Sequence, residues 1–157
     1  MATNAHVVQG ADSFTVRFEN GTEIAAPPVG TDPFRDVAVL QLELAEGQTL
    51  PAIAPVGNSS AMRPGDPVVA VGAPLGEFAK TVLGGIIGGI DRPPDLGPGY
   101  RPDTLILHDA ERSSDSSGGP LLSMRGEVIG MNVAIVDTGR QVGNGGAVSS
   151  GLNFAID

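Results

Sequence analysis

One stretch of the chain, residues 113–122 (SSDSSGGPLL), has the composition of an exposed nucleophile turn. Gly118 and Gly119 allow a sharp turn and a close approach to another group, and Pro120 then begins an extended segment. Such a turn can present the hydroxyl of Ser117 at the mouth of a cleft. Because a serine hydroxyl is a weak nucleophile alone, it needs a histidine to take its proton and a carboxylate to orient that histidine.

The chain supplies both of these partners in suitable local settings. His6 follows a short polar turn in residues 3–8 (TNAHVV), beside an apolar run. Asp36 lies in residues 32–40 (DPFRDVAVL), directly before a strand rich in β-branched residues. The order along the chain is histidine, aspartate, serine, a set of side chains that can carry out nucleophilic acyl transfer.

These three motifs, in this order, resemble those of the chymotrypsin-like serine proteases, and most closely those of the HtrA (Deg) branch. The likeness continues through further segments and covers nearly the whole chain: GDPVVAVGAPLG at residues 65–76, GEVIGMN at 126–132 and GLNFAI at 151–156. The resemblance implies a fold of two β-barrel lobes with a cleft between them. It also implies that His6 is the general base, Asp36 the residue that orients it, and Ser117 the nucleophile.

Each of the three catalytic assignments has a rival. His108 lies within a strand, where the family usually has a polar residue that is not catalytic. Asp32 precedes a proline and has the setting of a turn residue, whereas Asp36 leads directly into a strand. Ser116 is the second choice for the nucleophile, because Ser117 alone stands directly before Gly-Gly-Pro.

The resemblance implies an oxyanion hole formed by backbone N–H groups at Asp115, Ser116 and Ser117. Two residues before the nucleophile the family has glycine, and this chain has Asp115. A residue with a Cβ is costly in such a turn, and a carboxylate opposes the charge that develops on the oxyanion. We therefore expect slow catalysis.

Residues that contact the substrate are also implied by the resemblance. Asn132, Val133 and Ala134 should present a strand edge to an extended peptide. Leu152 and Phe154 should line one wall of the first specificity pocket. Glu111 lies six residues before Ser117, where an acid would favour a basic substrate side chain, whereas pockets of HtrA-like enzymes are usually apolar.

Composition excludes several other classes of function. The net charge of −9 argues against a nucleic-acid partner. The chain has no cysteine, so thiolate metal sites and disulfides are excluded, and the proposed chemistry needs no metal or cofactor. The first residues (MATNAHVVQG) lack the pattern of a signal peptide, and the most apolar run, residues 81–90, is shorter than the roughly 20 residues that span a bilayer.

The chain has the size of one domain, and its 23 Gly and 13 Pro residues in 157 predict an all-β fold with many turns. We expect a partial N-terminal barrel in residues 1–55, a crossover in 56–66 and a C-terminal barrel in 67–157. Residues 13–18 and 23–26 predict a hairpin, and residues 27–33 a loop. In the family about three strands precede the histidine turn, so we expect an incomplete first lobe. No PDZ domain is expected in this chain.

The sequence therefore predicts a serine endopeptidase that hydrolyses unfolded polypeptides. An alternative, motivated by Asp115 and the incomplete first lobe, is a catalytically impaired module that binds peptides or another chain. The resemblance further implies a homotrimer and a location in the cell envelope, periplasmic or secreted.

Overall fold

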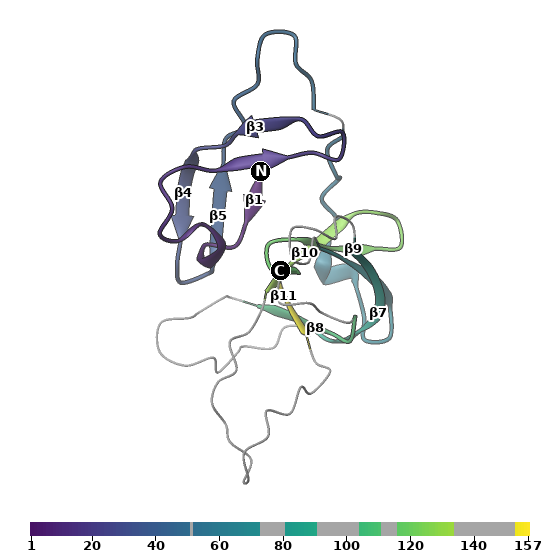
Figure 1. Ribbon diagram of the computed structural model, residues 1–157. Helices are drawn as coiled ribbons and strands as arrows, with labels where there is room; N and C mark the ends of the chain where they lie inside the picture. The colour runs from purple at the N-terminus through teal and green to yellow at the C-terminus, as the bar shows by residue number, and fades with distance from the viewer. Residues whose placement is uncertain (51, 73–80, 91–103, 111–115, 134–152) are drawn as a thin grey trace.

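The computed structural model describes residues 1–50, 52–72, 81–90, 104–110, 116–133 and 153–157 of the chain (Figure 1). Within these ranges the regular structure is β-strand, apart from short 3₁₀ turns at His6–Val8 (η1) and Ser59–Ala61 (η2). The strands form two small N-terminal sheets and one closed barrel. This arrangement confirms the predicted all-β class with two lobes, of which the first is incomplete.

The barrel has six antiparallel strands in the order β10-β11-β8-β7-β6-β9. Their bounds are Pro67–Gly72 (β6), Thr81–Gly89 (β7), Leu105–His108 (β8), Pro120–Ser123 (β9), Val128–Val133 (β10) and Asn153–Ile156 (β11). Closure leaves these strands without an open sheet edge. The barrel therefore gives a rigid support to the turn between β8 and β9, which carries Ser117.

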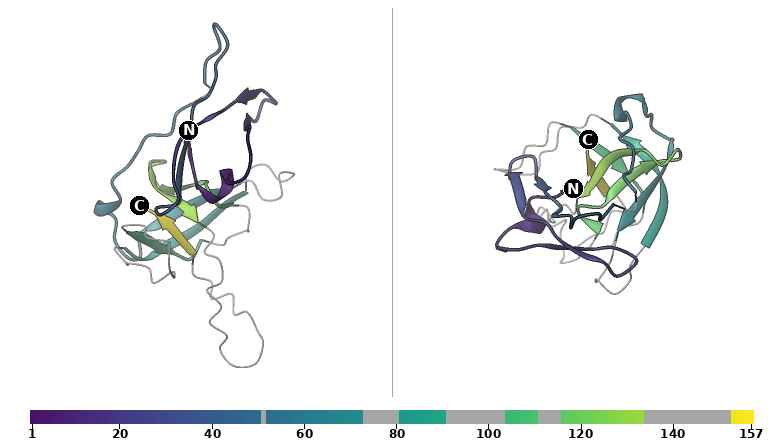
Figure 2. Two further views of the ribbon diagram at one scale, coloured as in Figure 1. Left: turned by 90° about the vertical axis from the view of Figure 1, so that its left-hand side faces the viewer. Right: turned by 90° about the horizontal axis from the view of Figure 1, so that it is seen from above.

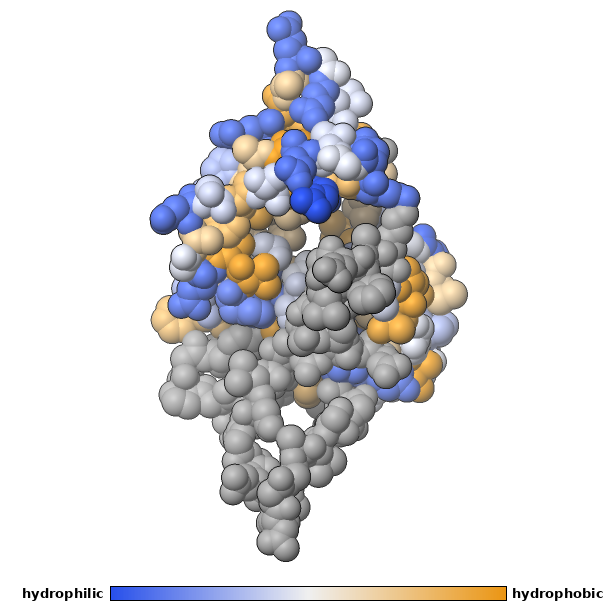
Figure 3. Space-filling model, viewed as in Figure 1, coloured by the Kyte–Doolittle hydropathy of each residue, from blue (hydrophilic) through white to orange (hydrophobic). Residues whose placement is uncertain are grey.

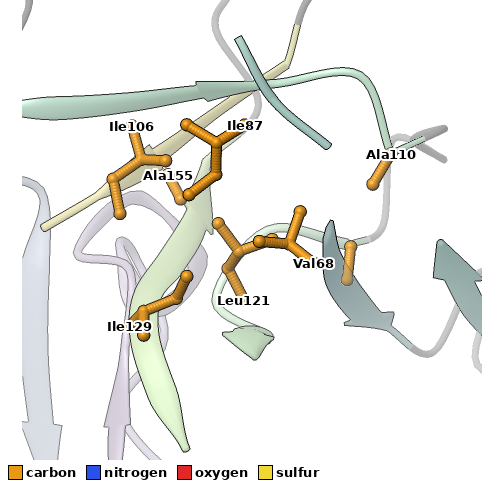
Figure 4. Close-up of a cluster of buried hydrophobic side chains, with 8 residues drawn as sticks. Val68, Ile87, Ile106, Ala110, Leu121, Ile129 and Ala155 are labelled. Carbon is orange, nitrogen blue, oxygen red and sulfur yellow. The ribbon is translucent and has the colours of Figure 1, made fainter. Parts of the chain in front are cut away.

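The barrel core consists of branched aliphatic and alanine side chains from several of its strands. Figure 4 shows Val68 and Leu121 near the centre of this cluster, with Ile87, Ile106 and Ile129 around them. Alternate residues of β6 point inward, and Val68 and Ala70 are buried. Burial of each large aliphatic side chain contributes about 1.5–3 kcal/mol.

The N-terminal lobe is open. One sheet has the strand order β1-β5-β4, with bounds Ala2–Thr3 (β1), Pro28–Asp32 (β4) and Val37–Leu40 (β5). The other is the predicted hairpin, Thr15–Arg17 (β2) and Glu23–Ala25 (β3). Val8, Ala26, Ala38 and Leu40 form the small core between them.

The prediction of a loop at residues 27–33 was wrong, because most of this segment is strand β4. The strand pairs with β5 at the edge of the sheet, with Thr31 opposite Ala38 and Asp32 opposite Val37. It is exposed along nearly its whole length, so it has no alternation of buried and exposed residues. Its glycine and proline content suggested a loop. Proline is nevertheless tolerated at the start of an edge strand, so the segment can still pair with β5.

The two lobes meet at the first residue of β5. Val37 packs against a barrel cluster of Leu105, Val133 and Ile156. The side view in Figure 2 shows the N-terminal strands above the barrel. This contact fixes Asp36, the residue before Val37, against the second lobe.

Apolar side chains are exposed on the outer side of the N-terminal lobe. Val29 and Phe34 are more than half exposed, and Val39 nearly half. In Figure 3 orange atoms appear among blue ones on the left of the upper lobe, over β4 and β5 of Figure 1. Val39 lies on the face of β5 opposite the buried Ala38 and Leu40, and no described segment covers that face.

Candidate active site

The pairing of β1 with β5 brings the histidine turn to the aspartate. Thr3 lies opposite Ala38, so the residues that follow Thr3 and those that precede Ala38 leave the sheet at the same end. His6 then begins the 3₁₀ turn η1, whose buried Val8 anchors it to the small N-terminal core. The ring of His6 is left 43% exposed and can face a substrate.

Asp36 is buried and makes a pair of bonds to one residue. Its Oδ1 accepts a hydrogen bond from the backbone N–H of His6 at 2.8 Å. Its Oδ2 lies 2.7 Å from Nδ1 of the same histidine. With its proton on Nδ1, the imidazole donates to the carboxylate and keeps Nε2 as the acceptor that a general base requires.

Asp36 adopts a left-handed backbone conformation, with a φ of 55°. Among the described residues it is the single non-glycine residue with a positive φ. Aspartate tolerates this region better than most residues, at a cost of about 1 kcal/mol. The backbone of Asp36 is held by Asn4, whose Nδ2 donates to the Asp36 carbonyl oxygen at 3.0 Å.

Asp32, the rival aspartate, has the expected role in a turn. Its Oδ1 accepts hydrogen bonds from the N–H groups of Phe34 at 3.0 Å and Arg35 at 3.1 Å. The N–H of Arg35, followed by that of Phe34, holds the pKa of the Asp32 carboxyl below its usual value. Asp32 therefore shapes the approach to Asp36, while Asp36 bonds His6.

The nucleophile turn packs directly against the histidine segment. Gly118 has a φ of +82°, and a Cβ added to it would lie 2.2 Å from Oγ1 of Thr3 and 3.4 Å from the Asn4 nitrogen. A Cβ on Gly119 would lie 2.1 Å from the carbonyl oxygen of Val71. No side chain fits at either position, which is the steric reason for glycine at both. The turn that follows Ser117 therefore lies against the segment that precedes His6.

The two rival serines differ in exposure. Ser116 is 7% exposed, and its Cα and Cβ lie against Gly72 of β6. Ser117 is only partly buried. A nucleophile must reach a substrate, so this difference favours Ser117.

Asn132 anchors the nucleophile turn, a role that the sequence did not indicate. Its carbonyl oxygen accepts a hydrogen bond from the N–H of Gly118 at 2.9 Å, and its own N–H donates to the carbonyl oxygen of Gly119 at 2.8 Å. Its Nδ2 donates to the carbonyl of Pro120 at 3.0 Å. These backbone groups of Asn132 are engaged within the chain and present no free edge to a peptide, and pairing of a peptide at Val133 and Ala134 stays a prediction.

The remaining predicted site residues fall into two groups. Val133 and Phe154 pair across β10 and β11; Val133 is buried in the cluster against which Val37 packs, and the partly buried Phe154 packs against the same cluster. Four others lie outside the described residues: Asp115, Glu111, Ala134 and Leu152.

A family model for the trypsin-like peptidase domain matches residues 1–131. The chain belongs to this family. Among its curated relatives are the serine protease Do-like HtrA of Bacillus subtilis, 38% identical over 94% of this chain and 33% of that protein. A probable periplasmic serine endoprotease, DegP-like, of Brucella suis is 39% identical over 99% of this chain and 28% of that protein.

Solved structures of the HtrA type have the same fold as this trypsin-like peptidase domain. The HtrA-type protease AlgW, solved with a decapeptide, superposes with a TM-score of 0.81 at 38% identity. That match covers 99% of this chain and 43% of the AlgW chain. The chain spans about a third of the length of the curated relatives named above.

In this trypsin-like peptidase domain, the rival histidine lies in the barrel. His108 is 2% exposed, on β8 between Ile87 of β7 and Asn153 of β11. Neither of its ring nitrogens has a hydrogen-bond partner among the described residues. Burial lowers the pKa of His108, an effect that the Asp109 carboxylate opposes. It makes no bond to Asp36.

Within the part of the chain that the structure describes, no cluster of His, Cys, Asp or Glu side chains is arranged to hold a metal ion. No helix in that part is long and apolar enough to cross a membrane.

Proposed function

We propose that this chain is the catalytic domain of a serine endopeptidase. His6 takes the proton of the Ser117 hydroxyl as that oxygen attacks the carbonyl carbon of a peptide bond. Asp36 holds the imidazole in the Nδ1–H tautomer and stabilises the imidazolium that forms. His6 then gives the proton to the leaving amine, and water hydrolyses the acyl-enzyme by the same route in reverse.

The observation that carries this proposal is the buried carboxylate of Asp36 facing a half-exposed imidazole. Both oxygens of Asp36 bond His6, through the backbone N–H and through Nδ1. Three features distinguish this pair from an ordinary surface ion pair: the carboxylate is buried, it makes two bonds to one residue, and its backbone is left-handed. The contact of Gly118 with Thr3 supports the placement of Ser117 on the same side of the histidine turn.

The oxyanion hole of this proposal lies at residues 115–117, with backbone N–H groups as donors. The fixed turn at Gly118 and Gly119, tied to Asn132 of β10, gives the hole a rigid base. Preorganised donors of this kind usually supply a large part of catalysis. Asp115 is the weak point, because it brings a Cβ and a negative charge to the hole.

The proposed substrates are unfolded polypeptides, and the proposed location is the cell envelope. Relatives of this chain are serine proteases, one of them named as periplasmic, and AlgW was solved with a decapeptide. A homotrimer is proposed from the HtrA resemblance alone. Glu111 in the pocket would favour a basic substrate side chain over an apolar one.

Active-site labelling tests the proposal. A fluorophosphonate reacts with an activated serine, and peptide mass spectrometry locates the label. We expect the label on Ser117, and its loss in Ser117→Ala, His6→Ala and Asp36→Ala. Ser116→Ala is the matched control, and it should still be labelled at Ser117.

Two results would overturn the proposal. A folded protein that takes no label over hours, together with peptide binding, would support the impaired peptide-binding module instead. A label on Ser116 that persists in Ser117→Ala would move the nucleophile by one residue.

A further inference from the structure

Asn4 is a fully buried amide between the two halves of the proposed catalytic centre. It has no exposed surface. On one side its Nδ2 donates to the carbonyl oxygen of Asp36 at 3.0 Å. On the other side its backbone nitrogen lies 3.4 Å from the position that a Cβ of Gly118 would take. The side chain of Asn4 therefore bonds the residue that pairs with His6, and its backbone faces the turn of the nucleophile.

The orientation of the Asn4 amide follows from chemistry. The atom facing the Asp36 carbonyl must be Nδ2, because an amide oxygen there would place two acceptors against each other. The other atom, Oδ1, then has no partner among the described residues. A buried acceptor without a partner costs about 1–3 kcal/mol. An apolar side chain of the same shape would avoid that cost, so the amide is not explained by packing alone.

The Asn4 amide supplies a hydrogen bond that stabilises the unfavourable backbone conformation of Asp36. Asp36 has a φ of 55°, which is costly for a residue with a Cβ. This conformation directs its carbonyl to Asn4, while its carboxylate bonds His6 at both oxygens. If Asp36 relaxes toward an ordinary β conformation, both oxygens of its side chain move relative to the imidazole.

We propose that Asn4 is a positioning residue, which holds the backbone of Asp36 so that its carboxylate keeps His6 in the Nδ1–H tautomer. The catalytic consequence rests on the proposed function, but the positioning itself does not. Asn4 acts through Asp36 and touches no reacting atom in this scheme.

The chain is well suited to a direct test, because His6 and His108 are its only two histidines. Long-range ¹H–¹⁵N NMR spectra of the two rings report which nitrogen of each carries the proton. In the unaltered protein at about pH 8 we expect His6 as the Nδ1–H form. In Asn4→Leu, which keeps the branched shape and removes the donor, we expect a mixture that gains the Nε2–H form.

Asn153→Ala is the matched control. Asn153 is also a buried amide whose Nδ2 donates to a backbone carbonyl, that of Ala110, at 2.7 Å. It lies opposite His108 in the barrel. The control should change the signals of the His108 ring and leave the tautomer of His6 unchanged. Asn4→Leu should change the tautomer of His6 and leave the signals of the His108 ring unchanged.

A measurement on the unaltered protein covers the case in which Asn4→Leu does not fold. The side-chain NH₂ protons of Asn4 should exchange slowly with solvent, unlike those of Asn20, which is exposed. Fast exchange at Asn4 would overturn the proposal, and so would an unchanged His6 tautomer in folded Asn4→Leu.

Kinetics separate this proposal from the proposed function. If the chain is a peptidase, Asn4→Leu should lower kcat by at least about tenfold, toward the ~10⁴-fold that a wrong histidine tautomer costs, with little change in KM. If no peptidase activity or labelling exists but the NMR results are as expected, the role of Asn4 stands and the proposed function fails.

Discussion

Both carboxylate oxygens of Asp36 bond His6, one through the backbone N–H and one through the ring nitrogen Nδ1. The first bond fixes where the histidine turn lies, and the second fixes how its ring is oriented. One buried side chain thereby sets both the position and the tautomer of the proposed general base.

Replacement of this carboxylate by an amide is the most direct test of its role. Asparagine tolerates the left-handed backbone of residue 36, so Asp36→Asn should fold nearly as well as the unaltered protein. The amide favours the wrong tautomer of His6, and we expect kcat on a peptide substrate to fall by about 10⁴-fold. Activity within a few-fold of the original would show that Asp36 does not orient the base.

Gly118 should be much less tolerant of a side chain than Gly126. Both have a positive φ, but a Cβ at Gly118 meets Thr3 at 2.2 Å and one at Gly126 meets nothing within 4 Å. Gly126→Ala should cost about 1–2 kcal/mol of stability, and Gly118→Ala about 1–3 kcal/mol more, with loss of labelling at Ser117. Urea denaturation measures both.

A double-mutant cycle identifies the contact. Thr3→Ala removes the oxygen that Gly118→Ala would strike, so the double variant should recover about 0.5–3 kcal/mol relative to the sum of the single changes. Additive effects would mean that the two segments do not touch.

Two adjacent glycines of β7 make a second matched pair. A Cβ at Gly84 meets nothing within 4 Å, whereas one at Gly85 lies 2.3 Å from the nitrogen of Ala110. Gly84→Ala should leave stability unchanged or raise it by about 0.5–1 kcal/mol. Gly85→Ala should cost about 1–3 kcal/mol and reduce labelling of Ser117, because Ala110 precedes the nucleophile loop. Equal urea midpoints for the two variants would contradict this.

His108 should make the barrel less stable in acid. Its pKa is lowered by burial, so the unfolded chain takes up a proton at a higher pH than the folded chain does. Stability is therefore lost as the pH falls below about 6.5 toward the lower pKa of the folded state. His108→Leu removes this contribution, so its urea midpoint should fall less between about pH 7.5 and 5.5 than that of the unaltered protein. Parallel curves would contradict this, because they would show that His108 takes up its proton over the same pH range in the folded and unfolded chains.

Asp115 should slow the reaction that we propose. Asp115→Gly removes a Cβ and a charge from the oxyanion hole, and kcat/KM on an unstructured peptide should rise, by up to about a hundredfold. Asp115→Asn removes the charge alone and should give part of this gain. Equal or lower activity in Asp115→Gly would mean that the hole is formed in another way.

The sequence by itself determined the class of fold and the identity of the candidate residues. Strand alternation and turn residues are local properties, so the hairpin predicted at residues 13–18 and 23–26 is found in the structure as β2 and β3. His6, Asp36 and Ser117 were preferred to His108, Asp32 and Ser116 because their neighbours resemble the motifs of the protease family. Edge strand β4 was missed because exposure on both faces leaves no periodic signal.

The tertiary structure alone decided how these residues meet. Asn4 and His6 bond Asp36 across 32 and 30 residues of sequence, and Asn132 ties down a turn twelve and more residues before it. No local pattern encodes such contacts, because strand register and the packing of Val37 against the barrel bring them together. The left-handed backbone of Asp36 has the same origin. A conformation that is unfavourable for the isolated residue persists only where bonds from distant parts of the chain offset its cost.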